Sequence, residues 1–264
     1  MPGDERDRRW ATAPRPHRIV DLRADGPGRL TLSLSAAGVA GPPAPRALPG
    51  QYWVLDLAGD VRVPAVDVTY GPGDTLVRMT TLRVPCGLSM GTVGDLVEVR
   101  GPMGAGWDLE SAAGRDLVLI GWDTGVSLLR PLIEQADDLA VRSVRLWAGG
   151  CARWVSRPEW RDLATREGVR LSPGPAMTAA ADELDLDTGN TVALLAGPWP
   201  MACDTAKALI GRGLPTASVQ LAAHGLLGCG NRRCGRCRLD DPGGALRACL
   251  DGPVLRYDRI LRGT

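Results

Sequence analysis

The chain has 264 residues, enough for two or three compact units rather than one small module. Its 31 lysines and arginines nearly balance its 30 aspartates and glutamates, so neither nucleic acid nor an anionic membrane surface is expected as a partner. No apolar run reaches the length of a membrane span and the N-terminus lacks the apolar core of a secretory signal, which predicts a soluble cytoplasmic protein.

The first part of the chain has the rhythm of an antiparallel β-barrel. Residues 1–16 are charged and proline-containing and are expected to form a flexible tail. Residues 17–112 contain short runs rich in Val, Leu and Thr, separated by Gly, Pro and Asp, a pattern typical of short strands joined by turns. The expected strands lie within 17–24, 29–35, 51–58, 61–70, 75–84 and 95–100.

Residues 113–223 alternate between apolar strands and helical patterns, which predicts a parallel sheet covered on both faces. Helices are expected from the apolar spacing over 128–139, from Ser156 onward, and over 201–212. Pro131 inside the first pattern predicts a helix that starts late or is kinked. The expected strands lie at 117–120, 144–147, 169–172, 192–195 and 218–221, the last of these closing the sheet.

Residues 224–264 carry four cysteines in the spacing C-x4-C-x2-C followed by eleven residues and the fourth cysteine: Cys229, Cys234, Cys237 and Cys249. This spacing matches the plant-type ligand run for a 2Fe-2S cluster, because soft thiolates suit iron and one loop supplies three of them. Neighbouring glycines allow the sharp turns that such a loop needs. We therefore expect these cysteines to be the metal ligands.

Two alternatives for the four cysteines stay open. A zinc ribbon usually carries two C-x2-C pairs, whereas this segment has one. A disulfide pair requires an oxidising compartment, for which the sequence gives no sign. The remaining cysteines, Cys86, Cys151 and Cys203, are isolated and are expected to behave as small apolar residues.

The order of barrel, nucleotide-type α/β domain and cysteine loop fits electron transfer. A flavin can be held between a barrel and a parallel sheet, next to a centre that carries single electrons. The sequence therefore predicts a multidomain β plus α/β fold: an antiparallel β-barrel, then a parallel-sheet nucleotide-binding-type domain, then a C-terminal iron–sulfur loop.

From His17 to Leu261 the chain resembles the ferredoxin-reductase-like electron-transfer subunits. These include the gamma subunits of cytoplasmic NiFe hydrogenases and the corresponding subunits of anaerobic sulfite reductase and dihydroorotate dehydrogenase. The most specific likeness is CGNRRCGRC (229–237) with CLDGPVLRY (249–257), similar to C-G-x-x-x-C-G-x-C and C-x-D-G-P-V-F-x-Y. Weaker likenesses lie at 49–51, at 100–104 and at 196–201.

The resemblance implies a diaphorase-type subunit. It would pass electrons between FAD or NAD(P)H and a catalytic partner, such as a NiFe hydrogenase, through the 2Fe-2S cluster, and it would need that partner for net catalysis. The resemblance makes residues 17–112 a flavin-binding-type barrel, 113–223 an NAD(P)-binding-type domain and 224–264 the cluster-binding segment. The contacts it implies are Pro64, Ala65, Val66, Gly87 and Ser89 for the flavin, and Gly125, Gly197 and Pro198 for the pyridine nucleotide.

This chain departs from the family pattern mainly at the nucleotide sites. Val66 stands where the family places a hydroxyl near the flavin, and Ala196 stands where a cysteine usually lies. Trp122 and Asp123 replace two small residues in the A-G-G-x-G turn that lets a pyrophosphate approach a helix. An alternative function is therefore a non-enzymatic relay or assembly subunit that keeps the cluster but has lost flavin or pyridine-nucleotide binding.

The cluster loop shows two further features. His224 occupies the place of a glutamate common in the family, and it is expected to be a structural residue rather than a ligand. Four arginines surround the cysteines and could either face an acidic partner or simply be solvated: Arg232, Arg233, Arg236 and Arg238.

Overall fold

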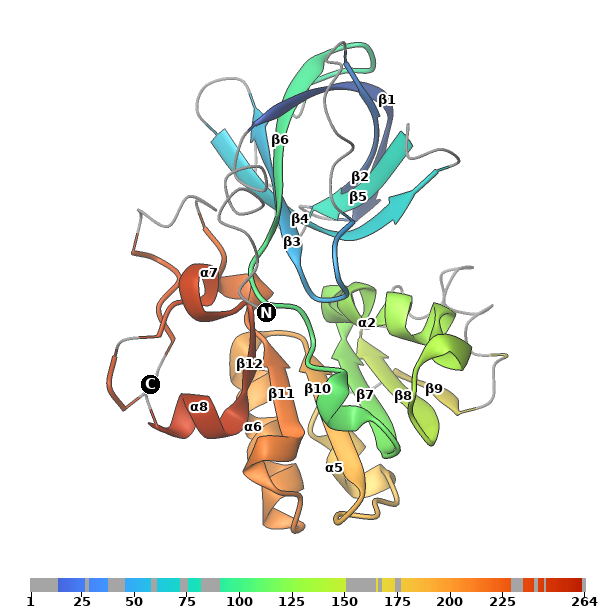
Figure 1. Ribbon diagram of the computed structural model, residues 1–264, viewed down its shortest axis with the longest axis vertical. Coiled ribbons are helices and arrows are strands. Elements are labelled where there is room, and N and C mark those ends of the chain that lie inside the picture. The colour runs from blue at the N-terminus through green and yellow to red at the C-terminus, as the bar shows by residue number, and fades with distance from the viewer. Residues whose placement is uncertain are drawn as a thin grey trace.

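A computed structural model shows two packed bodies, a barrel and a sheet covered by helices, with the C-terminal segment lying beside both (Figure 1). The structure describes residues 14–26, 29–37, 46–57, 61–71, 76–81, 91–150, 165, 168–173, 177–228, 235–239, 242–244 and 246–262.

The first body is a closed antiparallel barrel with the strand order β1-β2-β5-β4-β3-β6. Its core contains side chains from all of these strands, among them Leu32, Trp53 and Val99. The expected barrel is confirmed, although β1 begins at Arg15, inside the segment expected to be a tail. The strands are β1 (Arg15–Gly26), β2 (Arg29–Ala36), β3 (Tyr52–Leu57), β4 (Val61–Tyr70), β5 (Leu76–Thr81) and β6 (Leu96–Met103).

The second body is a sheet with the order β12-β11-β10-β7-β8-β9. All neighbouring strands run parallel except β11 and β12. The expectation that residues 218–221 form the last strand is wrong, because β12 pairs outside them. The strands are β7 (Asp116–Trp122), β8 (Ser143–Gly150), β9 (Val169–Pro173), β10 (Thr191–Ala196), β11 (Val219–Ala222) and β12 (Val254–Arg256).

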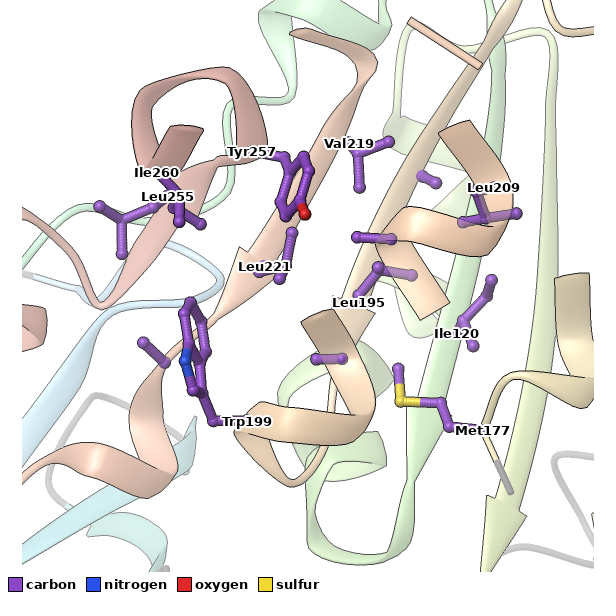
Figure 2. Close-up of a cluster of buried hydrophobic side chains, with 14 of the residues drawn as sticks. Ile120, Met177, Leu195, Trp199, Leu209, Val219, Leu221, Leu255, Tyr257 and Ile260 are labelled. Atoms are coloured by element: carbon purple, nitrogen blue, oxygen red, sulfur yellow. The ribbon is translucent and has the colours of Figure 1, made fainter. Parts of the chain in front are cut away.

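Helices cover both faces of this sheet, as expected. Val118 and Ile120 of β7 pack in one cluster with α6 (Trp199–Gly211), α5 (Ala179–Glu183) and α8 (Tyr257–Arg262). Figure 2 shows Leu195, Leu209, Leu221 and Tyr257 in that cluster. The alternate residues of β7 pack in a second cluster with α2 (Val126–Glu134). This alternation is what a strand buried on both faces requires.

The first helix differs from its prediction. It begins at Val126, five residues before Pro131, so the expected late start is wrong. It ends at Glu134, because the following residues form a 3-10 turn, η4 (Ala136–Asp138). The helix predicted from Ser156 lies outside the described residues. The other short helices are η2 (Glu110–Ala112), η3 (Asp123–Gly125), η5 (Thr216–Ser218), η6 (His224–Leu226) and α7 (Ala248–Asp251).

Across the ranges given above, the structure contains no helix long and apolar enough to cross a membrane.

Candidate functional site

The C-terminal segment is tied to the barrel where β6 leaves it. The backbone N–H of Ala105 donates to the Gly252 carbonyl at 2.8 Å. Nearby, the side-chain Nε2 of Gln51 donates to the Gly104 carbonyl at 2.9 Å. Gly104 has a φ of +78°, and a Cβ there would lie 2.3 Å from Cδ of Pro253. Glycine is therefore required, because any side chain would push the two segments apart. We call this contact of 49–51, 101–105 and 252–254 the junction.

His224 adds a second tie at the junction. Its Nε2 lies 2.8 Å from the Gly50 carbonyl, which can only accept, so Nε2 carries the proton and donates. Burial lowers the pKa of His224 to about 4, so the ring is neutral near pH 7. Its Nδ1 is buried and has no hydrogen-bond partner within the described part of the chain. His224 thus has a structural role, as expected, since the barrel already occupies its Nε2.

The burial of the His224 ring makes the stability of the protein depend on pH. The folded pKa of about 4 lies below the ordinary value of 6.5, so the unfolded chain binds more protons between these pH values. The contribution of the neutral, buried His224 to the free energy of unfolding is fully present above pH 6.5. It falls as the pH drops toward 4, by up to about 3 kcal/mol. Urea unfolding at stepped pH measures the slope.

His224→Gln keeps a donor but does not titrate, so it should lose most of that slope. His17 also has a lowered pKa, mainly because it is buried. His17→Gln is therefore the matched control, since it measures the part of the pH dependence that comes from His17. A slope that His224→Gln leaves unchanged would contradict the role given to His224.

Two of the four expected ligands lie side by side. The Sγ atoms of Cys237 and Cys249 are 2.9 Å apart, and these residues are 2% and 3% exposed. This separation exceeds a disulfide bond, about 2.05 Å, so the two are not cystine. Two buried thiols side by side are a donor set that suits a soft metal centre. Cys229 and Cys234 lie outside the described residues.

The pair is held by backbone hydrogen bonds from both sides. The Ala248 amide donates to the Cys237 carbonyl at 2.8 Å, and the Leu239 amide donates to the Leu246 carbonyl at 3.0 Å. The Arg247 amide donates to the Asp251 carboxylate at 2.8 Å, which closes the turn of α7. These bonds bring Cys249 to Cys237 across the eleven intervening residues.

The arginines around the cysteines are only partly placed. Arg236 and Arg238 are exposed, and residue 238 forms an isolated antiparallel bridge with Arg247. Arg232 and Arg233 lie outside the described residues.

The residues assigned to the pyridine nucleotide come together at the carboxyl ends of β7 and β10. A Cβ at Gly125 would lie 2.1 Å from the Ala196 carbonyl oxygen and 2.6 Å from the Gly197 nitrogen. Pro198 follows directly and precedes the first turn of α6. The structure thus brings the three predicted positions side by side and also gives Gly125 a packing role, because two backbone segments touch there.

The residues assigned to the flavin lie at the boundary between the two bodies. Pro64, Ala65 and Val66 are all buried on β4. Ala65 belongs to the barrel core, whereas Val66 packs with Tyr52, Val54 and the side chains of α2. Val66 therefore faces the boundary where a flavin between the bodies would lie, and it offers apolar surface there. Gly87 and Ser89 lie outside the described residues.

A cavity of about 280 Å³ opens at the same boundary, which the sequence did not reveal. It is lined by the loop 46–51, by Val68 and Tyr70 of β4, and by Ser127 and Leu128 of α2. Arg29 reaches across the boundary and donates to Ser127 Oγ at 2.5 Å. The cavity is at the small end of the range typical for ligand sites, about 300–1,000 Å³, so a whole dinucleotide would extend beyond it.

The C-terminal segment matches a known domain. Residues 224–261 match the model of the iron-sulfur cluster binding domain of dihydroorotate dehydrogenase B. This range contains all four cysteines of the C-x4-C-x2-C and C-terminal pattern. The match favours iron–sulfur over the zinc and disulfide alternatives.

Longer likenesses cover most of the chain. It is 30% identical over 223 residues to the probable dihydroorotate dehydrogenase B (NAD(+)), electron transfer subunit of Methanocella arvoryzae, covering 81% of each chain. Its counterpart in Methanothermobacter thermautotrophicus is 33% identical over 176 residues, and this chain spans 62% of that protein. Sulfhydrogenase 1 subunit gamma of Pyrococcus furiosus is 25% identical over 241 residues, covering 81% of this chain and 80% of that protein.

A solved structure supports the same fold. The NADH-dependent reduced ferredoxin-NADP oxidoreductase superposes with a TM-score of 0.68 at 21% identity, covering 93% of this chain and 91% of that one. The barrel, the sheet and the cysteine segment thus follow a ferredoxin-reductase-like plan. The match to the Methanocella subunit shows that the chain, which is also similar to a sulfhydrogenase gamma subunit, belongs to the family of dihydroorotate dehydrogenase B electron transfer subunits.

Proposed function

We propose that this chain is the diaphorase-type electron-transfer subunit of a multi-subunit oxidoreductase in the cytoplasm. It passes electrons between FAD and NAD(P)H on one side and a catalytic partner on the other, through a 2Fe-2S cluster held by Cys229, Cys234, Cys237 and Cys249. The partner is a catalytic oxidoreductase subunit of the kind that its relatives' names indicate, such as a hydrogenase. FAD, when bound, exchanges electron pairs with NAD(P)H, and a 2Fe-2S cluster carries one electron at a time.

The observation that carries the proposal is the junction. Electron transfer between a flavin and a cluster needs a short and fixed separation, which the contacts at the junction would provide. His224 and Gly252 bond to Gly50 and Ala105, which lie beside the barrel, and the buried cysteine pair follows from the same segment. The cysteines are therefore anchored to the body whose β4 faces the flavin boundary.

The proposal divides the chain into domains with different cofactors. We assign 15–112 to the flavin-binding-type barrel, 113–223 to the NAD(P)-binding-type domain and 224–264 to the cluster segment. In support, β1 to β6 close one barrel and β7 to β11 form the parallel sheet. The cluster segment is not a separate body, because β12 supplies the antiparallel edge of that sheet.

A cofactor inventory tests the proposal. Protein purified without oxygen should contain about one flavin, about two irons and about two acid-labile sulfides per chain. Its optical spectrum and the EPR spectrum of the reduced protein should show both groups. Full iron without any flavin would contradict the FAD assignment, and zinc in place of iron would contradict the cluster.

The relay subunit remains the second candidate. It is supported by the side chains at four nucleotide positions, where Val66 brings no hydroxyl, Ala196 brings no thiol, and Trp122 and Asp123 replace small residues. The two candidates differ in one measurement. Reduction of the cluster by NADH or NADPH in the absence of any partner supports the diaphorase and eliminates the relay.

A further inference from the structure

The crevice for a nucleotide in this sheet is defined by the strand order. From β7 the chain proceeds outward through β8 and β9, then returns to place β10 and β11 on the other side. In such sheets ligands bind beyond the carboxyl ends of the strands, at the point where the order reverses. That point lies between the ends of β7 and β10, at Gly121 and Ala196, which are register partners.

Trp122 is the last residue of β7 and lies across this crevice. A Cβ at Gly197, just after β10, would be 3.0 Å from Cβ of Trp122. A Cβ at Gly149, near the end of β8, would be 2.6 Å from Cε3 and Cζ3 of the same indole. The side chain thus starts beside β10 and ends over β8, in the space that two glycines leave free.

The indole is held there by a second tryptophan. The rings of Trp122 and Trp147 are 6.2 Å apart between centroids, with their planes at 18°. Such a stacked pair is stabilised beyond the apolar area that it buries. Trp147 is fully buried and its Nε1 donates to the Glu183 carboxylate at 3.0 Å, so it is a fixed platform for the half-buried Trp122.

Asp123 lies next in the same turn and keeps a backbone shape that favours glycine. Its φ is +53°, the sole positive value among the described residues other than glycine. Aspartate tolerates this region better than most residues. The turn therefore has, at Asp123, a backbone conformation that favours glycine, and it places a carboxylate directly before α2.

From these contacts we propose that the Trp122 indole is a displaceable plug over the nicotinamide-nucleotide crevice. A dinucleotide binds only to molecules in which the indole has left Gly149 and Gly197. This deepens the proposed function and rests on it, since it concerns how the same crevice admits NADH or NADPH. Only the fraction of molecules whose indole is displaced can bind the dinucleotide. The apparent affinity of the protein for the dinucleotide is therefore weaker than the affinity of that fraction.

Binding to the complete, cofactor-loaded chain tests the plug. Trp122→Gly should lower the dissociation constant for NADH or NADPH by about tenfold or more, measured by calorimetric titration without oxygen. Trp122→Phe should give a smaller decrease, because a phenyl ring still covers part of the platform. Trp53→Phe is the matched control at a tryptophan of the barrel core, and it should leave the dissociation constant within about twofold.

A spectroscopic readout needs no loss of the indole. The stacked pair should give a coupled signal in circular dichroism, identified by its absence in Trp147→Phe. That signal should disappear as NADH saturates the unmodified chain. If Trp122→Gly fails to fold, this measurement and Trp122→Phe still decide the matter.

Three results would overturn the plug: an unchanged or weaker affinity in folded Trp122→Gly, a coupled signal that persists at saturation, or no nucleotide binding by any variant. The first two results leave the proposed electron-transfer function standing, which the flavin and iron inventory tests separately. The third result would also favour the relay subunit over the diaphorase. Likewise, an absent flavin with tighter NADH binding in Trp122→Gly would leave the plug standing.

Discussion

Replacing Cys249 with alanine is expected to abolish the iron–sulfur cluster. Iron should fall from about two atoms per chain to nearly none, because a 2Fe-2S cluster needs four protein ligands and a methyl group cannot replace a thiolate. The buried Sγ of Cys249 lies 2.9 Å from Sγ of Cys237, so no solvent-exposed residue can take its place without opening the segment. Elemental analysis, visible absorption and EPR of the reduced protein measure the loss.

Cys203→Ala is the matched control for this change. Cys203 is a half-buried cysteine on α6, outside the four-cysteine pattern, so its removal should leave the iron content and the EPR spectrum unchanged. Cys237→Ala should reproduce the loss seen in Cys249→Ala. Full iron in either ligand variant, with a folded chain, would refute the assignment of that cysteine.

The barrel and the sheet were predictable because their signals are local. Alternating apolar residues such as Leu32 and Leu34 mark a strand with one face in the core, and both belong to the barrel core. The cysteine spacing is equally local, and the domain match over 224–261 agrees with it. In each of these cases one short stretch of the chain carries the whole pattern.

The missed elements depend on contacts between distant residues. β12 has three residues, Val254–Arg256, which is too short for any periodicity, and it is a strand because β11 offers it an edge. Gly104 and Pro253, which are in contact at the junction, are 149 positions apart in the sequence. No local pattern predicts that contact. The late start expected from Pro131 was wrong because α2 is packed against β4 and β7, and this packing outweighs the cost of proline in a helix.

The side chains at the crevice show where sequence reasoning reaches its limit. The departures at Trp122 and Asp123 were visible as substitutions, but their consequence required the positions of Gly149 and Gly197. A bulky residue in a nucleotide turn can point to solvent or into the site. The geometry shows that the indole of Trp122 lies beside the carboxyl ends of the strands, over Gly149.

Gly125→Ala is expected to destabilise the α/β domain by about 4 kcal/mol or more. The added Cβ would lie 2.1 Å from the Ala196 oxygen and 2.3 Å from its carbonyl carbon. Both are backbone atoms of a fully buried central strand, so no rotamer change relieves the overlap, and η3 must move away from β10. Urea unfolding followed by far-ultraviolet circular dichroism measures the loss.

Gly211→Ala is the matched control, because a Cβ at that position meets no atom within 4 Å. Gly211 ends α6, where alanine favours the helix, so this variant should be unchanged or stabilised by up to about 1 kcal/mol. The pair also separates two roles for Gly125. If the glycine serves only to let a pyrophosphate approach, Gly125→Ala will fold with normal stability and lose NADH affinity. If close packing of η3 on β10 requires it, stability falls first, with or without nucleotide.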